Sequence, residues 1–574
     1  MAKEVVLFYE ERTTTPTSTS PRLPALCGPP LKSARRHWRA GALIALVLAA
    51  SFFLPLTSAS GVGPAATHDS SSITATLRVG SSTTTLYRSF FGVNGETTPV
   101  TAYTQVPKLG AYLNSTPIGM IRYSAGEDEC NVTTDTMWLA GPTGGIPIPN
   151  GCDYDVASFA AWCDSLTPHC ESDIGLPGEN NNSAEDAYFA AYIVKTLGFQ
   201  PTYWSIGNEP ISWTHYGIPW QKWKLTDNSA PTGVAYAVDV RNAVRAVKAV
   251  DPAAQFVGLQ SYWCPDVTYT EPIAAIDGDS INAISCHVYT NDGTSTPTTA
   301  QYFASLMGPK NITSNYYDLK AHIRDLCAKC SSLPIQIGEF QGGPVGLPAP
   351  QDRGYLGAVW MAASFVQALN AGIQSVQVFN LQGAPGCEFC MLNAFDVPDP
   401  QGLLFSDVFS NLERGRPVYN VSVRSDNTNL WATMIHGTIT NTSQILFVNA
   451  NVSHAETFGL STRFFTTGQP GSILSWNDPA ASPTTTKYPA LPDRVTVPPL
   501  SLVLVTVTPN PSSAAAPSAS PFLADPAPVV GGHALPLPGV DPAYAEQRAL
   551  AAAVVARGAE YPVPAPTFSS PRAG

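Results

Sequence analysis

Short apolar runs recur from Phe90 to about Gln382, and longer stretches of helical character separate them. Each run is rich in apolar, β-branched or aromatic residues, and most end on glycine or polar residues, which is typical of a buried strand. Eight such runs occur: FFGVNGE (from Phe90), IGMIRYS (from Ile118), IGLPGE (from Ile174), TYWSIGNE (from Thr202), QFVGLQS (from Gln255), INAISCHVY (from Ile281), PIQIGEF (from Pro334) and SVQVFNLQ (from Ser375).

The stretches between these runs repeat apolar residues every three or four positions, with glycine or proline at their ends. The pattern is clearest in AEDAYFAAYIVKTLG, GVAYAVDVRNAVRAVKAVDP, YYDLKAHIRDLCAKC and LGAVWMAASFVQALNAG. Strand and helix alternating eight times predict an α/β fold of the (β/α)8 TIM barrel type over residues 90–410.

The pattern changes after the barrel. Residues 411–509 hold short alternating runs with turn residues between them, such as LWATMIHGTI, SQILFVNANV and SLVLVTVTP, and almost no helical period. Residues 71–89, which precede the first barrel strand, have the same texture. We therefore expect an accessory antiparallel β-sandwich formed from both flanks of the barrel.

The two ends of the chain differ from the rest. Within the leader of residues 1–60, a Lys/Arg-rich flank precedes the apolar run 40–56, and small residues follow it. This order is typical of a secretory signal peptide, although a signal anchor is an open alternative. Either reading predicts a secreted protein or one held at the extracellular face of a membrane through residues 40–56. Residues 510–574 are Ala/Pro-rich and predict a disordered tail.

Composition narrows the possible partners. The chain of 574 residues is 44% hydrophobic and can bury a large core, yet only 13% of its residues are charged and its net charge is -12. Nucleic acid is therefore not expected as a partner, because phosphate binding requires a basic surface. Composition leaves the oligomeric state open.

The number and spacing of the cysteines favour an exported protein that contains disulfides. Eleven are present, and ten remain when Cys27 in the leader is set aside. Neighbours in sequence suggest five disulfides, although zinc is an alternative for the two Cys-x-x-Cys pairs. The candidate pairs are Cys130 with Cys152, Cys163 with Cys170, Cys264 with Cys286, Cys327 with Cys330, and Cys387 with Cys390. Glycosylation sequons begin at Asn114, Asn131, Asn181, Asn311, Asn420, Asn441 and Asn451.

Two carboxylates close predicted strands of the barrel. Asn208 and Glu209 end the fourth run, and Glu339 ends the seventh. A TIM barrel carries its chemistry at the carboxyl ends of its strands, so these residues face one another across the barrel mouth. Two carboxylates about 5 to 5.5 Å apart are what a retaining glycosidase requires, one as acid and the other as nucleophile.

These motifs resemble the clan A glycoside hydrolases, in which Asn-Glu-Pro closes strand four and Gly-Glu closes strand seven. Arg122 and the sequence His287-Val288-Tyr289 are further features that members of this clan carry. The barrel with its flanking sandwich resembles the heparanase and β-glucuronidase family, and also the xylosidase, iduronidase and glucocerebrosidase-type families. The resemblance covers roughly residues 71–509.

The resemblance implies a role for each matching residue. Glu209 would be the general acid/base and Glu339 the nucleophile of a double displacement, while Asn208 would bind the sugar hydroxyl next to the anomeric carbon. Tyr289 and Arg122 would keep Glu339 ionised, and His287 would tune Glu209 or contact sugar. No metal or organic cofactor is implied.

The remaining substrate contacts are predicted from local sequence. Trp213 and Tyr216 follow Glu209 in an aromatic loop, and aromatic faces stack on sugar rings. The eighth run reads FNLQG where many clan members place a tryptophan, so Gln382 is a candidate contact instead. The expected substrate is a glycoside, oligosaccharide or polysaccharide. The competing hypotheses are an inactive carbohydrate-binding protein on the same barrel and a structural protein of the cell envelope.

Overall fold

The structure, a computed structural model, describes most of residues 74–508. Within this span it leaves out 96–106, 124–155, 177–182, 211–231, 262, 291–296, 309, 343–351, 353, 383–389, 394–396, 438–441, 461–467 and 479–481. The predicted leader, with its apolar run 40–56, and the predicted tail 510–574 lie outside the described residues. In the part of the chain that is described, no helix is both long and apolar enough to cross a membrane.

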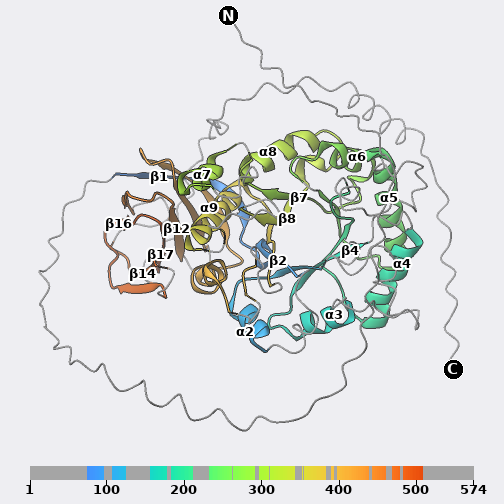
Figure 1. Cartoon of the computed structure of the whole chain (residues 1–574), viewed down its shortest axis with the longest axis horizontal. Helices are drawn as coiled ribbons and strands as arrows, with labels where there is room; N and C mark the ends of the chain where they lie inside the picture. The colour runs from blue at the N-terminus through green and yellow to red at the C-terminus, as the bar shows by residue number, and fades with distance from the viewer. Residues whose placement is uncertain are drawn as a thin grey trace, which may run out of the picture. The chain divides into compact units, whose positions relative to one another are not determined.

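Eight parallel strands close into a barrel, as the repeating pattern predicts (Figure 1). Each strand pairs with its neighbour in sequence, and the first pairs with the last. The strands are β2 (Phe91–Asn94), β3 (Met120–Tyr123), β4 (Glu171–Leu176), β5 (Tyr203–Ile206), β6 (Phe256–Ser261), β7 (Ala283–Tyr289), β8 (Ile335–Gln341) and β9 (Ser375–Val378). The fourth and seventh predicted runs are therefore β5 and β8.

Helices surround the barrel and connect its strands (Figure 1). The α-helices are α2 (Pro107–Ser115), α3 (Val156–Ser165), α4 (Ser183–Ala191), α5 (Gly233–Val250), α6 (Val267–Asp277), α7 (Thr299–Ala304), α8 (Ile312–Ile323), α9 (Tyr355–Ala371) and α10 (Pro400–Leu403). Short 3-10 or π segments are η1 (Arg88–Phe90), η4 (Tyr192–Leu197), η6 (Ser305–Met307), η7 (Cys330–Ser332), η8 (Leu404–Val408) and η9 (Phe409–Asn411). The side chains of Thr232, Asp266, Thr298 and Asn311 cap the first turns of α5, α6, α7 and α8.

An antiparallel sandwich accompanies the barrel and is built from both flanks, as predicted. Its larger sheet has the order β1-β10-β11-β12-β17-β14-β15, and its smaller sheet pairs β13 with β16. Phe447 and Phe458 pack across the two sheets with ring centroids 4.6 Å apart. The strands are β1 (Thr76–Thr85), β10 (Pro417–Arg424), β11 (Leu430–His436), β12 (Ser443–Asn449), β13 (Glu456–Gly459), β14 (Gly471–Trp476), β15 (Thr484–Tyr488), β16 (Arg494–Val497) and β17 (Ser501–Val507).

Helix α9 joins the barrel to the sandwich. All of its residues from Gly357 to Leu369 are buried, as expected for a mainly apolar helix covered on all sides. Thr83 of β1 donates to the carbonyl oxygen of Leu369 (2.8 Å), and Asn370 donates to that of Ala432 in β11 (2.9 Å). At the other end, Tyr355 donates to the carbonyl oxygen of Trp476 (2.9 Å). The sandwich is therefore anchored on the helix that follows β8.

Strand β4 differs from its prediction. The sequence pattern begins this strand at Ile174, whereas it spans Glu171–Leu176. The polar sequence Glu171-Ser172-Asp173 does not look like a buried parallel strand, which is normally a continuous apolar run. Ser172 and Asp173 are nevertheless buried. Asp173 points into the polar interior of this barrel, described below.

Three of the five expected disulfides lie within the described residues. They join Cys163 to Cys170, Cys264 to Cys286 and Cys327 to Cys330. The Cys327 and Cys330 pair is thus a bridge rather than a zinc ligand pair. Cys390 is also disulfide-bonded, but Cys387, Cys130 and Cys152 lie outside the described residues. Use of the sequons stays a prediction.

Asp239 gives the fold a testable pH dependence. This aspartate is buried on α5, and desolvation raises its pKa to about 7. Because the folded state holds the proton more tightly than the unfolded state, the contribution of Asp239 to stability is complete below pH 4 and is lost as the pH rises through 7. We expect the free energy of unfolding of the wild type to fall by at most about 4 kcal/mol between pH 4 and pH 8 because of Asp239, and Asp239→Asn to lack this decrease.

Urea unfolding of the wild type and the variant across this pH range measures the difference. Asp325→Asn is the matched control, because the side chain of Asp325 is 74% exposed. The same pH dependence in wild type and Asp239→Asn would contradict the assignment.

Candidate active site

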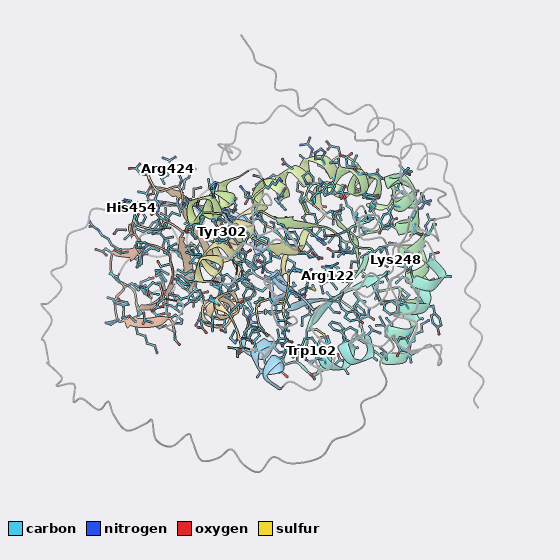
Figure 2. The ribbon with its side chains drawn as sticks, viewed as in Figure 1. Arg122, Trp162, Lys248, Tyr302, Arg424 and His454 are labelled. Atoms are coloured by element: carbon cyan, nitrogen blue, oxygen red, sulfur yellow. A yellow bond between two sulfur atoms is a disulfide. The ribbon has the colours of Figure 1, made fainter. Side chains whose placement is uncertain are left out.

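The barrel interior is largely polar. Its one separate apolar layer consists, among the described residues, of Met120, Tyr203, Val257 and Ala283. TIM barrels are usually filled by layers of bulky apolar side chains. Here every strand also contributes at least one buried polar side chain: Gln336, Glu339 and Gln341 on β8, and on the other seven strands Asn94, Arg122, Asp173, Ser205, Gln260, Ser285 and Gln377. Figure 2 shows Arg122 within the ring of strands.

Strand β8 contributes Gly338 at this level, directly before Glu339. A Cβ atom at position 338 would lie 1.8 Å from Oε1 of Gln260 and 2.6 Å from Oγ of Ser285. Glycine at position 338 therefore leaves the space that the side chains of Gln260 and Ser285 occupy beside β8. Glu339 follows a register shift relative to β7 and is only 4% exposed.

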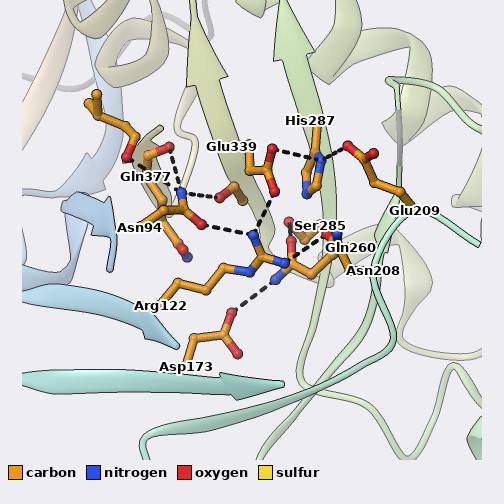
Figure 3. A network of polar contacts seen from close by, with 12 residues as sticks. Asn94, Arg122, Asp173, Asn208, Glu209, Gln260, Ser285, His287, Glu339 and Gln377 are labelled. Carbon is orange, nitrogen blue, oxygen red and sulfur yellow. Dashed lines mark hydrogen bonds and ion pairs between the residues drawn. The ribbon is translucent and has the colours of Figure 1, made fainter. Parts of the chain in front are cut away.

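Arg122 ties Glu339 to the rest of the interior (Figure 3). Its Nη1 donates to Oε1 of Glu339 (2.8 Å) and to Oδ1 of Asn94 (2.8 Å), and its Nη2 donates to Oδ1 of Asn208 (2.7 Å). Asn94 in turn donates from Nδ2 to the carbonyl oxygen of Gly338 (2.9 Å). One guanidinium group thus orients side chains at the ends of three strands.

Glu209 lies just beyond β5 in an unusual backbone conformation. Its φ of 43° is in the left-handed region, which costs a residue with a side chain about 1 kcal/mol or more. The hydrogen bond from its backbone N–H to the carbonyl oxygen of Gln260 (2.7 Å) holds this conformation in place. Its side chain is buried and is directed toward β7 (Figure 3).

His287 and Tyr289, on one face of β7, contact both carboxylates. Nδ1 of His287 lies 2.5 Å from Oε1 of Glu209 and 3.4 Å from Oε2 of Glu339. The hydroxyl of Tyr289 donates to Oε2 of Glu339 (2.7 Å). One ligand atom each of Glu209, His287 and Glu339 lie within 4.8 Å of one another, so these three side chains could also hold a metal ion.

Six of the predicted site residues therefore come together: Arg122, Asn208, Glu209, His287, Tyr289 and Glu339. Gln382 is buried beyond β9 and pairs with Leu392 in an isolated parallel bridge. Trp213 and Tyr216 lie outside the described residues. The role of each of these residues stays a prediction.

The polar residues below the site are not identified by reasoning from strand ends alone. Asp173, Gln260, Ser285 and Gln377 lie inside strands rather than at their ends, and Asn94 is the last residue of β2. A signal is present in the sequence, because a parallel strand buried on both faces is normally apolar. Polar residues within several such runs indicate that the barrel interior is a hydrogen-bonded network.

The fold is shared with solved glycoside hydrolase structures, although sequence comparisons find no counterpart. No family profile matches this sequence, and no curated protein does. A family 51 α-L-arabinofuranosidase from Bifidobacterium longum is 14% identical, with a TM-score of 0.59, covering 77% of this chain and 100% of its own. The α-L-arabinofuranosidase from Thermotoga maritima, in an arabinose complex, is 12% identical, with a TM-score of 0.57, covering 76% and 100%.

A third similar structure carries a different activity. CelM2, a bifunctional glucanase-xylanase from a metagenome library, is 13% identical, with a TM-score of 0.54, covering 76% of this chain and 99% of its own. At sequence identities this low, the structural similarity shows a common fold alone, the (β/α)8 barrel with a β-sandwich. The fold expected from the clan A resemblance is thereby confirmed.

Gly338 provides a test of the interior network. We expect Gly338→Ala to lower the free energy of unfolding by about 1 to 3 kcal/mol, because Gln260 must move away from buried hydrogen-bond partners. Urea unfolding measures this change. Gly80→Ala in β1 is the matched control, since its new Cβ would meet no atom closer than 3.5 Å. Equal free energies of unfolding for the two variants would show that the interior accommodates the added methyl group without loss of stability.

Proposed function

We propose that this protein is a retaining glycoside hydrolase, with Glu209 as the general acid/base and Glu339 as the nucleophile. The observation that carries the proposal is the close approach of the two carboxylates, whose nearest atoms lie within 4.8 Å. Retaining enzymes hold their carboxyl groups about 5 to 5.5 Å apart, whereas inverting enzymes leave about 6.5 to 9.5 Å for a water molecule.

The proposed reaction has two displacements. Glu339 attacks the anomeric carbon while Glu209 gives its proton to the glycosidic oxygen, so the leaving group departs as an alcohol and a glycosyl ester forms on Glu339. Glu209, now a carboxylate, takes a proton from water as that water attacks the same carbon. The ester bond then breaks, and both side chains return to their starting states.

The surrounding contacts fit these roles. Arg122 and Tyr289 both donate to Glu339, which favours the ionised nucleophile. His287 lies close enough to Glu209 for the two groups to share one proton, and that proton must leave and return in each cycle. Because Oδ1 of Asn208 accepts from Arg122, the amide nitrogen of Asn208 is oriented to donate to a sugar hydroxyl.

We infer that the sugar is neutral. Arg122 is the guanidinium group of the described site, and its charge is already paired with Glu339. A glucuronide would leave its carboxylate without a matching cation among the described residues around the carboxylate pair. Two of the similar structures reported above are named arabinofuranosidases and one a glucanase-xylanase, which makes neutral pentosides and glucosides the first substrates to test.

We further infer that the enzyme acts outside the cytoplasm. Disulfides persist in oxidising compartments, and three of them lie within the described residues.

Removal of the nucleophile tests the mechanism. We expect Glu339→Ala to lower hydrolysis of an activated aryl glycoside at least about 1,000-fold. Azide should restore turnover, because the small anion fits where the carboxylate was removed and attacks the anomeric carbon. Proton NMR of the glycosyl azide gives its configuration, which should be opposite to that of the substrate.

The acid and its control complete this experiment. Glu209→Gln should slow hydrolysis of poor leaving groups far more than that of dinitrophenyl glycosides, which depart without protonation. Glu271→Gln is the matched control, because Glu271 is a buried carboxylate paired with His322 at 2.8 Å outside the barrel. Activity in Glu339→Ala without azide would overturn the proposal. Sugar binding by an inactive wild type would instead support the carbohydrate-binding alternative.

A substrate panel tests the sugar. We expect the wild type to hydrolyse at least one neutral aryl glycoside among arabinofuranoside, xyloside and glucoside at least about tenfold faster than the glucuronide, because an unpaired buried charge costs more than about 1.4 kcal/mol. Release of the aryl alcohol measures each rate. Preference for the glucuronide would show that a cation outside the described residues recognises the substrate.

A further inference from the structure

One buried carboxylate of the barrel has no part in the proposed reaction. Asp173 of β4 is 0% exposed and lies in register with Arg122 of β3. Neighbouring residues in register on parallel strands point to the same side of the sheet, so both side chains enter the barrel interior. An ionised carboxylate at this depth requires partners, because burying an unpaired charge is very costly.

The contacts of Asp173 supply such partners (Figure 3). Nε2 of Gln260 donates to Oδ2 of Asp173 (2.9 Å), and Oε1 of Gln260 accepts from Ser285 (2.5 Å). The backbone carbonyl oxygen of Gln260 accepts the N–H of Glu209, as described above. A single glutamine therefore links the buried aspartate to the backbone of the proposed acid/base.

Opposing effects act on the ionisation of Asp173. Burial raises the pKa of Asp173 above its ordinary value, and Arg122 and hydrogen bonds from Ser205, Gln260 and Gln377 oppose this rise and favour the ionised form. Arg122 is the one cation that faces both Asp173 and Glu339 among the described residues. Its positive charge is thus shared between two carboxylates.

We propose that Asp173 is a positioning residue that controls the ionisation of Glu339 through Arg122. The inference rests on the proposed function. An ionised Asp173 offsets part of the positive charge of Arg122 that acts on Glu339. Glu339 is therefore more basic, and a stronger nucleophile, than it would be if Arg122 interacted with Glu339 alone. Without the negative charge of Asp173, Arg122 would favour ionised Glu339 more strongly.

Other groups that titrate near these residues must be separated from this effect. Tyr203 on β5 faces Asp173, and its own pKa is raised, chiefly by burial. Glu339 faces His287 and Tyr289 on β7 and Glu209 beyond β5. The measurement must therefore distinguish the ionisation of Glu339 from that of the pair of Glu209 and His287.

The pH dependence of kcat/KM makes this distinction. Its acid limb reports ionisation of the nucleophile, and its alkaline limb reports loss of the acid proton. We expect Asp173→Asn to move the acid limb to lower pH by about one unit and to leave the alkaline limb in place. Asparagine keeps an oxygen that accepts from Gln260, so the geometry of the network is retained.

A matched control separates charge near Arg122 from any buried aspartate. Asp239→Asn makes the same chemical change on α5, in the outer helical layer, and should not move the acid limb. An unmoved acid limb in a folded Asp173→Asn variant would overturn the inference, and so would an equal shift in Asp239→Asn.

Two further measurements keep the inference testable if the first cannot be made. If Asp173→Asn does not fold, Gln260→Met removes one donor to Asp173 and should shift the acid limb in the same direction by a smaller amount; no shift would overturn the inference.

If the wild type hydrolyses no glycoside, the proposed function fails. The effect of Asp173 on the ionisation of Glu339 through Arg122 can still be measured. Infrared difference titration then identifies the Glu339 carboxyl band by its loss in Glu339→Gln. Its midpoint should still lie about one pH unit lower in Asp173→Asn, and an unchanged midpoint would overturn the inference.

Discussion

The buried ion pair between Arg122 and Glu339 constrains the rest of the barrel. The two side chains are 1% and 5% exposed, and their atoms approach to 2.8 Å. Removing both charges from water costs several kcal/mol per ion, and the attraction between them offsets this cost only when their remaining hydrogen-bonding groups are satisfied. Asn94 and Asn208 meet that requirement for Arg122, and Tyr289 does so for Glu339.

The polar layer explains why the apolar packing of this protein lies mainly outside the ring of strands. A large aromatic cluster packs between β2, α9 and the segments that follow α10. Phe91 and Phe365 stack with centroids 5.8 Å apart, and Phe405 and Phe409 contact both of these rings. Apolar burial at the outer layer thus stabilises a barrel whose interior is used for hydrogen bonds. It also explains why α9, which packs against barrel and sandwich alike, is mainly apolar and is buried from Gly357 to Leu369.

Several features of the fold follow from sequence because they depend on local patterns. Period-2 and period-3.6 hydrophobicity predict eight alternating units and the sandwich, and the strand-end positions of Glu209 and Glu339 follow from those units. The start of β4 is not predicted because Asp173 interrupts the apolar run, and its burial depends on polar partners from other strands in the barrel interior. Gly338 is similar: its conformation is ordinary, and only the approach of Gln260 from another strand shows why a side chain is excluded.

The sequence by itself determined the order of strands and helices and the residues that stand at each strand end. These properties arise between residues a few positions apart. Only the tertiary structure decided which side chains meet. Arg122 and Glu339 are 217 positions apart, and Glu209 and His287 are 78 apart. Their distances depend on barrel closure and on the register shift between β7 and β8, which are settled by packing around the whole ring. The separation of the two carboxylates, on which the proposed chemistry depends, is therefore a property of the closed barrel.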